Sequence, residues 1–305
     1  MSIPSQQIET WSNQGSITTS RVTYTSIKTA LTRQSSPIAD MILSGVIKIG
    51  LQGSYAHDTN VYGDSDVDVV IQHTNTFHSN KLNLPVPQYQ QHEQDHFLAT
   101  YDWPDLRRDV IIALVQHYGV TNVDTTGKKS IKVLPTAGRL RIDVVPAITY
   151  KKYAYYYSLG NHSKEHGIAF KHTETNEYIV NYPDQHYDNA VAKQAVTNDR
   201  YKSLVRIFKN MRSYLIQKGQ LTKEEAPSYF IQGMVYNIPP SLFVTDKATT
   251  TLHALRWLRT ANLSSLISQN GQHSLLGNTA EYWNPTNAQK TVMELCFLWD
   301  NWGRI

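Results

Sequence analysis

The sequence predicts an α/β protein whose first half forms a mixed sheet and whose second half is mainly helical. Short β-branched runs bounded by turn residues are concentrated before Asp184, whereas helical spacing of apolar residues dominates after it. No repeat, low-complexity tract or Gly/Ser linker divides the chain. We therefore expect a sheet-containing lobe over residues 1–185, including an N-terminal helix, and a helical lobe over residues 186–305 packed on it.

The composition favours a globular protein. The chain has 305 residues, of which 40% are apolar and 18% charged. Its single cysteine, Cys296, excludes an internal disulfide and any multi-cysteine zinc site. The sequence lacks both a long apolar run and an apolar N-terminal signal segment, so we expect a cytoplasmic protein without membrane association. A net charge of +4 permits polyanionic substrates without requiring them.

In the first half, two apolar strands flank the turn that follows Gly53-Ser54. A stretch rich in Asn, Gln, His and Pro then reads as a loop, and the spacing of Leu106, Val110 and Leu114 indicates a helix. The expected elements in chain order are helix 19–31, strands 46–51 and 66–72, loop 73–96, helix 103–118, strands 130–134 and 139–148, and a hairpin over 167–182.

In the second half, the spacing of apolar residues predicts only helices. The expected helices are 188–196, 199–218, 226–237, 249–266 and 286–299. Of the twelve histidines, we expect the four in the 73–96 loop to have surface or loop roles and His57 to lie in a solvent-facing turn.

Three aspartates form the most informative pattern. Asp66 and Asp68 are two apart on an expected strand, so alternation directs both side chains to one face. Asp143 lies on a second strand in the similar context Ile-Asp-Val-Val. An Asp-x-Asp pair alone is a weak signal, because most such pairs lie in solvated turns. If the two strands pair, however, three carboxylates converge at one end of a sheet.

Three carboxylates placed close together repel one another and raise one another's pKa values. A hard divalent cation neutralises them, and Mg²⁺ prefers such oxygen ligands, shared with substrate phosphates; Mn²⁺ is a possible substitute. Two metal ions about 4 Å apart can activate an attacking hydroxyl and stabilise a leaving pyrophosphate. The preceding Gly53-Ser54 turn suits a triphosphate, since backbone amides and a serine hydroxyl can bind phosphate oxygens.

These residues resemble a known family. Gly-Ser, a spacer, Asp-x-Asp on a strand and a distal Asp are the signature of polymerase-β-like nucleotidyltransferases. Residues 52–56 (Gln-Gly-Ser-Tyr-Ala) with 64–68 (Asp-Ser-Asp-Val-Asp) resemble the bacterial cGAS/DncV-like nucleotidyltransferases, or CD-NTases. Residues 181–183, 198–212 and 227–229 add to the resemblance, which extends over residues 20–240 and is closest to clade E.

The resemblance implies a fold and an activity. The fold is a polymerase-β-like core braced by an N-terminal helix, followed by a helical lobe. The activity joins two or three nucleoside triphosphates into a cyclic di- or trinucleotide and releases pyrophosphate. Such messengers activate a downstream effector protein in anti-phage (CBASS) operons.

The resemblance also assigns roles to individual residues. Asp66 and Asp68 would bind both metal ions, and Asp143 would bind the ion that activates the acceptor hydroxyl. Gly53 and Ser54, with Gln52 beside them, would bind the donor nucleotide. In the family, a basic residue of the helix at 199–218 reaches the donor phosphates, and Lys202 or Arg206 is the candidate. A solvated basic face is the alternative interpretation.

Two further assignments concern the nucleotide. Ser228 and Tyr229 resemble a family pair in which serine contacts phosphate and tyrosine stacks on the base; a capping serine beside a core tyrosine is the alternative. Asn181 is a plausible equivalent of an asparagine linked in this clade to the use of uracil, which suggests UTP as a substrate. It could equally be a turn residue that bonds its own backbone.

Two other functions remain compatible with the sequence. The enzyme could transfer a nucleotide to tRNA or to a protein, as toxin-type relatives do, or the chain could be a non-catalytic nucleotide sensor. The presence of all three aspartates argues against the sensor. No Cys/His zinc insertion is visible, so we do not expect a nucleic-acid activator.

Overall fold

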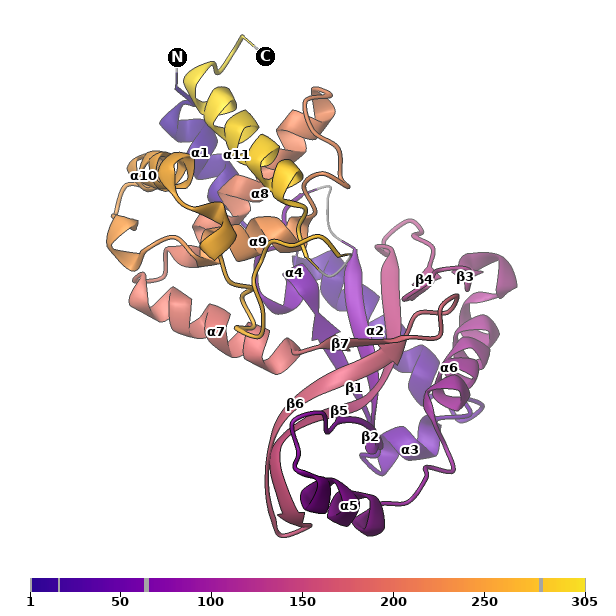
Figure 1. Ribbon diagram of the computed structural model, residues 1–305. Coiled ribbons are helices and arrows are strands. Elements are labelled where there is room, and N and C mark those ends of the chain that lie inside the picture. The colour runs from indigo at the N-terminus through magenta and orange to yellow at the C-terminus, as the bar shows by residue number, and fades with distance from the viewer. Residues whose placement is uncertain (1, 16, 63–65, 280–281, 305) are drawn as a thin grey trace. The chain divides into compact units, whose positions relative to one another are not determined.

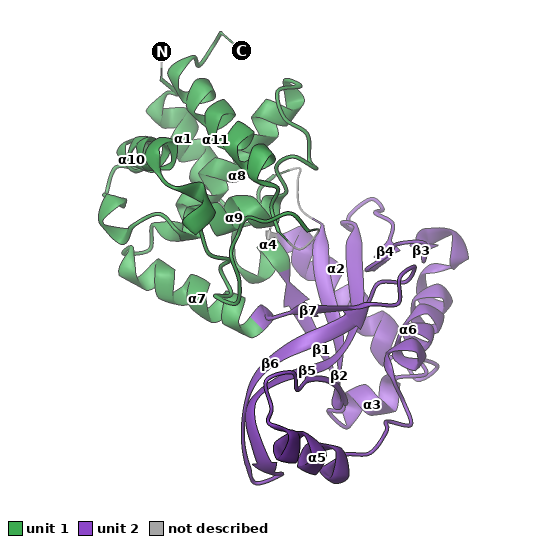
Figure 2. Cartoon of the chain, in the orientation of Figure 1, with its two compact units in different colours: residues 1–17, 53–65, 184–305 green, residues 18–52, 66–183 purple. Residues whose placement is uncertain are grey.

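The computed structural model describes residues 2–15, 17–62, 66–279 and 282–304. The chain divides into two compact units (Figure 2): unit 1 comprises residues 1–17, 53–65 and 184–305, and unit 2 comprises residues 18–52 and 66–183. The expected boundary near residue 185 coincides with one junction. The segments 1–17 and 53–65, however, belong with the helices rather than with the sheet, because side chains of the helix at 201–217 bind them.

Unit 2 is built on one seven-stranded sheet (Figure 1). Its central path runs β1-β2-β5-β4-β3, and β6 and β7 extend it from β5. The β2–β5 pair is parallel and every other pair is antiparallel, so the mixed sheet expected from the sequence is confirmed. The strands are β1 (Ile47–Gln52), β2 (Val67–Asn80), β3 (Val123–Asp124), β4 (Ile131–Val133), β5 (Ile142–Ser158), β6 (Asn161–Lys171) and β7 (Tyr178–Asn181).

Helix α6 (Trp103–Tyr118) packs on strands β3, β4 and β5. A capping box formed by Asp102 and Asp105 begins it, and its buried stripe includes Leu106, Val110 and Leu114. The remaining helices of unit 2 are α2 (Ile17–Thr32), α3 (Ala39–Leu43), α5 (Val86–Asp95) and η1 (Val120–Asn122).

The expected loop over residues 73–96 is wrong. Strand β2 continues to Asn80 beyond an irregularity between His73 and Phe77, because the long β5 strand supplies hydrogen-bond partners that the local sequence does not reveal. Helix α5 follows and packs on β5, where Tyr156 donates its hydroxyl to Asp95 at 2.8 Å. Two of the four histidines expected at the surface, His73 and His92, are therefore buried.

Unit 1 is helical, as expected. Its core joins α8 and α11 through apolar side chains that include Phe208, Leu295 and Cys296, together with Trp283 from a connecting segment. The expected helix 249–266 ends at Thr260, and a separate 3-10 turn follows at Leu263–Ser265. The elements are α1 (Ser5–Ser12), α4 (Gly53–Ala56), α7 (Pro183–Val196), α8 (Tyr201–Gln217), α9 (Ser228–Tyr236), η2 (Pro240–Leu242), α10 (Lys247–Thr260), η3 (Leu263–Ser265) and α11 (Pro285–Asp300). Within the described residues, no helix has the length and apolar character needed to span a membrane.

The packing of α6 predicts a contrast between two of its residues. Leu114 is fully buried, whereas Ile112 is 37% exposed. We expect Leu114→Ala to lower the free energy of unfolding by about 2–5 kcal/mol, because it leaves a cavity against the sheet. Ile112→Ala on the same helix is the matched control and should cost less than about 1 kcal/mol. Urea denaturation measures both, and equal losses would contradict the packing described.

Candidate active site

Four side chains form a row across the sheet of unit 2. In the parallel β2–β5 pair, Asp68 lies directly opposite Asp143. Gln52, the last residue of β1, is paired with Asp68 on the other side, and Lys132 of β4 is paired with Asp143. Paired residues on neighbouring strands point to the same face, so two carboxylates lie side by side between an amide and an ammonium group.

The opposite face of the same strands explains why this row is held in place. Val67 and Val69 of β2, and Ile142 and Val144 of β5, are all fully buried. Alternation therefore turns Asp68 and Asp143 away from the core, where both are partly exposed. The expected pairing of the two strands is confirmed.

Asp66 lies just outside the strand. β2 begins at Val67, whose amide donates to the carbonyl of Arg141 at 2.9 Å, and Asp66 itself is exposed. The expectation that Asp66 is part of the strand is thus wrong by one residue. Its charge nevertheless acts on Asp143: burial raises the pKa of Asp143, and the Asp66 carboxylate raises it further, against the opposing effect of Lys132.

The donor chemistry of these residues suits a hard divalent cation. In the described part of the chain, no group of three or more Asp, Glu, His or Cys side chains is arranged closely enough to hold a metal ion. Asp68 and Asp143 nevertheless supply two neighbouring carboxylates, and the pKa of Asp143 is raised first by burial and then by the nearby Asp66 carboxylate. Oxygen ligands with excess negative charge are what Mg²⁺ prefers.

Gly53 and Ser54 open the short helix α4 in unit 1, and Gly53 follows Gln52 directly in the chain. The φ angle of Gly53 is 64°, in the left-handed region that a side chain disfavours, so a glycine is required for this turn. The carbonyl of Ser54 accepts a hydrogen bond from the amide of Thr59 at 2.9 Å, which closes the turn behind it. Asp64 and Ser65 of the family motif lie outside the described residues.

The segment after the turn is anchored to α8 by buried polar contacts. Lys209 is only 4% exposed, and its ammonium group donates to the carbonyl of Thr59 at 3.1 Å and to its hydroxyl at 3.2 Å. The Thr59 hydroxyl in turn donates to Gln232 of α9 at 3.0 Å. Because a buried ammonium group is costly unless it is hydrogen-bonded, these contacts fix the segment in one position.

Lys202 and Arg206, the predicted phosphate contacts, also bind this segment. The Lys202 ammonium lies 2.7 Å from a carboxylate oxygen of Asp58. The Arg206 guanidinium donates to the carbonyls of Asp58 and Ser12, each at 2.5 Å. Arg206 is therefore occupied by backbone contacts, whereas Lys202 is held by one exposed carboxylate for which a phosphate could substitute. The phosphate contact itself stays a prediction.

The aromatic rings of Tyr229, His186 and His57 pack together next to Ser228, the other residue of the predicted Ser228-Tyr229 nucleotide contact. Tyr229 is 45% exposed on one side, and on the other it stacks on His186, with ring centroids 5.4 Å apart and planes 23° apart. His57 meets His186 edge-on at 4.7 Å. The amide nitrogen of Gln232 lies 3.2 Å from Nε2 of His186, and a neutral imidazole can accept this hydrogen bond.

Both histidines are uncharged near neutral pH. Burial lowers the pKa of His186 to about 3, and the neighbouring His57 and Lys209 add to the effect. Burial likewise lowers the pKa of His57 to about 4, with contributions from Lys209 and Lys202. The expectation that His57 lies in a solvent-facing turn is therefore wrong, because the helices of unit 1 bury it.

Ser228 and Asn181, the two remaining predicted residues, lie at element ends. Ser228 is the first residue of α9, after Pro227. Asn181 is the last residue of β7 and is exposed; it is paired with Ile168 of β6. Nothing in these positions assigns either residue a ligand, so their roles stay predictions.

Sequence reasoning missed the residues that hold the segment 53–62 and the ring of Tyr229. These are Thr59, Lys209, Gln232 and His186, and each acts through a contact distant in sequence. The only local signal was the spacing of Lys209 on the basic face of α8, three residues after Arg206. That spacing does not show that Lys209 is buried whereas Lys202 is only partly buried.

A mixed sheet carrying paired carboxylates, with a helical C-terminal domain, defines a nucleotidyltransferase of the polymerase-β-like fold. Comparison with known proteins agrees. Residues 188–300 match the family model described as the cGAS/DncV-like nucleotidyltransferase C-terminal helical domain. The cyclic UMP-AMP synthase of Rhodothermus marinus is 37% identical over 308 residues that cover 100% of both chains. The cyclic nucleotide synthase CdnE01 of Staphylococcus haemolyticus is 35% identical, over 99% of this chain and 100% of its own.

A solved structure supports the same assignment. The Rhodothermus marinus CdnE c-UMP-AMP synthase, determined with Apcpp and Upnpp, superposes with a TM-score of 0.86 at 38% identity, covering 99% of this chain and 98% of that one. The chain therefore belongs to the CD-NTases, the cGAS/DncV-like nucleotidyltransferases, and resembles their clade E. It is an enzyme of the cyclic oligonucleotide synthase class.

The buried histidines predict how stability depends on pH. Their folded-state pKa values of about 4 and about 3 lie below the ordinary value of 6.5, so below pH 6.5 the unfolded chain binds protons that the folded chain does not. Stability should therefore fall as the pH is lowered from 6.5 towards 4. We expect His186→Phe, which keeps a ring beneath Tyr229, to reduce this fall in urea denaturation at pH 7 and pH 5. His166→Phe, at an exposed position of β6, should leave it unchanged; an unchanged fall in His186→Phe would contradict the assignment.

Proposed function

We propose that this enzyme uses Mg²⁺ to join one uridine and one adenosine nucleotide into a cyclic dinucleotide, releasing pyrophosphate. The observation that supports this most is the side-by-side placement of Asp68 and Asp143 in a chain that matches a cyclic UMP-AMP synthase along its full length. Its substrates are cytoplasmic metabolites, and we place the enzyme in the cytoplasm. Its product would activate an effector protein in anti-phage defence.

The carboxylate row would organise the reacting groups. Asp66, Asp68 and Asp143 would hold Mg²⁺, or Mn²⁺ in its place, and the bound metal would supply charge stabilisation for phosphoryl transfer. Asp143 would orient the acceptor hydroxyl and accept its hydrogen bond. The Ser130 hydroxyl, 3.4 Å from one Asp143 oxygen, and the paired Lys132 restrict the position of this carboxylate. Positioning of this kind accounts for much of the rate enhancement in phosphoryl transfer.

The turn and the basic face of α8 would bind the donor triphosphate. The left-handed glycine brings the backbone close to a ligand, and the Ser54 hydroxyl can donate to a phosphate oxygen. Lys202 would exchange its Asp58 partner for a phosphate, whereas Arg206 would keep the turn in place through its backbone contacts. In unit 2, Gln52, paired with Asp68, carries an amide that can donate a hydrogen to a nucleotide.

Ser228 and Tyr229 would bind a phosphate and the base, respectively. Ser228 stands at the N-terminus of α9, where the helix dipole favours an anion. Tyr229 offers an exposed ring for stacking on a base, and His186 holds the ring from behind. The neutral His186 ring can accept a hydrogen from the Gln232 amide, which holds it beneath Tyr229.

Asn181 would select uracil. Its amide presents one donor and one acceptor, which complement the uracil edge, and its exposed position at the end of β7 leaves it accessible. We also propose that activity requires no DNA or RNA, which is supported by the single cysteine and the absence of a Cys/His metal-binding insertion in the sequence.

The carboxylate assignment is tested by replacing single aspartates. Asp68→Asn and Asp143→Asn should each lower pyrophosphate release from mixed NTPs by at least about 10²–10³-fold, because each removes charge where the metal would bind. Asp40→Asn, at an exposed site in the first turn of α3, is the control and should keep wild-type turnover. Thermal melts show whether the variants fold, and a folded Asp68→Asn enzyme with wild-type turnover would refute the assignment.

Base choice is tested with labelled substrates. Purified enzyme is incubated with each radiolabelled NTP, alone and in pairs, with Mg²⁺, then treated with phosphatase and separated by chromatography. A phosphatase-resistant product that requires both UTP and ATP is expected. Asn181→Ser should lower the preference for UTP over other NTPs by about tenfold, the scale of losing one hydrogen bond to the base. Label found on added tRNA or protein, with no small resistant product, would contradict cyclisation.

A further inference from the structure

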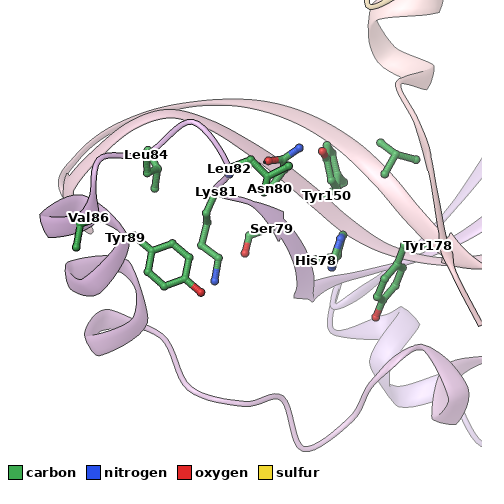
Figure 3. A pocket seen from close by; sticks show the side chains of 11 residues that line it. His78, Ser79, Asn80, Lys81, Leu82, Leu84, Val86, Tyr89, Tyr150 and Tyr178 are labelled. Atoms are coloured by element: carbon green, nitrogen blue, oxygen red, sulfur yellow. Dashed lines mark hydrogen bonds between the residues drawn. The ribbon is translucent and has the colours of Figure 1, made fainter.

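Unit 2 contains a pocket of about 630 Å³ between the end of β2 and helix α5 (Figure 3). This volume falls within the range of small-molecule sites, and the lining is mainly aromatic and aliphatic with a few polar groups, as in such sites. The residues that line it are His78, Ser79, Asn80, Lys81, Leu82, Leu84, Val86, Tyr89, Tyr150, Tyr178 and Val180.

The pocket is separate from the carboxylate row. Tyr150, in the pocket wall, follows Asp143 by seven residues on the uninterrupted strand β5, which corresponds to roughly 23 Å along the strand. An odd separation on a strand also places the two side chains on opposite faces. A ligand in this pocket therefore does not occupy the place of the reacting groups.

One wall of the pocket is an aromatic platform. The rings of His78 and Tyr178 are stacked, with centroids 4.0 Å apart and planes 18° apart, and Tyr150 lies 5.9 Å from His78. Figure 3 shows these rings on one side of the opening and Tyr89 of α5 on the other. Flat rings that face an open space favour a planar ligand that can stack on them.

The electrostatics of the pocket favour an anion. The ammonium group of Lys171 lies 5.0 Å from the centroid of the Tyr178 ring, and that of Lys81 lies 4.7 Å from the centroid of the Tyr89 ring. Burial lowers the pKa of His78, and the charges of Lys171 and Lys81 lower it further. The opposing carboxylates are Asp102, whose effect on that pKa is the weakest of those acting on it, and Glu93, which pairs with Lys81 while remaining 53% exposed.

The rim of the pocket is apolar and faces solvent. Leu82 is 90% exposed and Val86 is 69% exposed, although both flank the opening. A ligand seated in the pocket would remove part of these side chains from water, which favours binding. Contacts with the aromatic wall and with this rim would therefore favour binding of a ring system over binding of an inorganic ion.

We propose that this pocket is a second, non-catalytic binding site for a small planar aromatic anion, meaning a ring system that carries a phosphate or carboxylate group. The ring would pack against the aromatic wall that includes His78 and Tyr178, and the acidic group would face Lys81, while Lys171, next to the Tyr178 ring, adds positive charge nearby. The proposal does not depend on the reaction assigned to the enzyme, because it concerns binding at a site the reaction does not use.

Binding is measured on the full chain without NTP or metal, by fluorescence titration with 8-anilinonaphthalene-1-sulfonate as an aromatic anionic probe. Lys171→Glu reverses the charge next to Tyr178 in the pocket wall, and Leu82→Asp adds a carboxylate at the rim. Each should raise the dissociation constant by about tenfold. The matched controls are Lys48→Glu and Leu43→Asp, at exposed positions of β1 and α3, and neither should change it. Equal affinities in the pocket variants and their controls would overturn the proposal.

Displacement of the probe distinguishes the two sources of such an anion. Displacement by UMP but not by phenylacetate assigns the site to nucleotides, and the reverse assigns it to aromatic acids; either outcome supports the proposal. Displacement by neutral uridine at the same concentration as UMP would overturn it, because the acidic group would then contribute nothing. Turnover is not measured in these titrations, so failure of the proposed reaction leaves their result unaffected.

Discussion

The parallel pairing of β2 with β5 is the constraint on which the functional half of the molecule depends. It places Asp68 beside Asp143 and turns Val67, Val69, Ile142 and Val144 into the core. If β2 shifted by one residue in this register, Asp68 would turn into the core and Val67 and Val69 would turn away from it. Hydrophobic burial on one face therefore holds two neighbouring carboxylates on the other, and the charge of Lys132 opposes the rise in the pKa of Asp143.

In unit 1, hydrogen bonds from the helices hold the irregular segment that follows α4, at residues 58 and 59. The Arg206 guanidinium donates to the carbonyl of Asp58, and the buried Lys209 ammonium donates to the carbonyl of Thr59. The Thr59 hydroxyl donates to the amide oxygen of Gln232. Asp58 itself adopts a φ angle of 55°, which an aspartate tolerates at some cost. Removing one partner would leave a buried charge or amide unsatisfied, so this network has little freedom to move.

Strand β5 extends far beyond the carboxylate row, and at the other end of β2 it forms a pocket together with β7 and α5. Stacked rings and two lysines give that region a chemistry distinct from the row's. The strands β2 and β5 are long enough to carry the carboxylate row at one end and the aromatic pocket at the other, so one sheet holds two chemically different regions. The histidines of this region lie near tyrosines, and burial lowers the pKa of His78 and lowers that of His92 to about 4.

The sequence by itself determined the α/β class, the helical second half and the choice of Asp66, Asp68 and Asp143 as candidate metal ligands. Strand alternation and turn residues are local properties of the chain, so these features can be recognised without the tertiary structure. Asp66 was misplaced by only one residue, the usual uncertainty of an element end. Only the tertiary structure decided that residues 73–80 form a strand, that His57 is buried, that Lys209 binds Thr59, and that segment 53–65 belongs with the helices. Each of these depends on partners supplied by distant parts of the chain, which no local pattern of residues records.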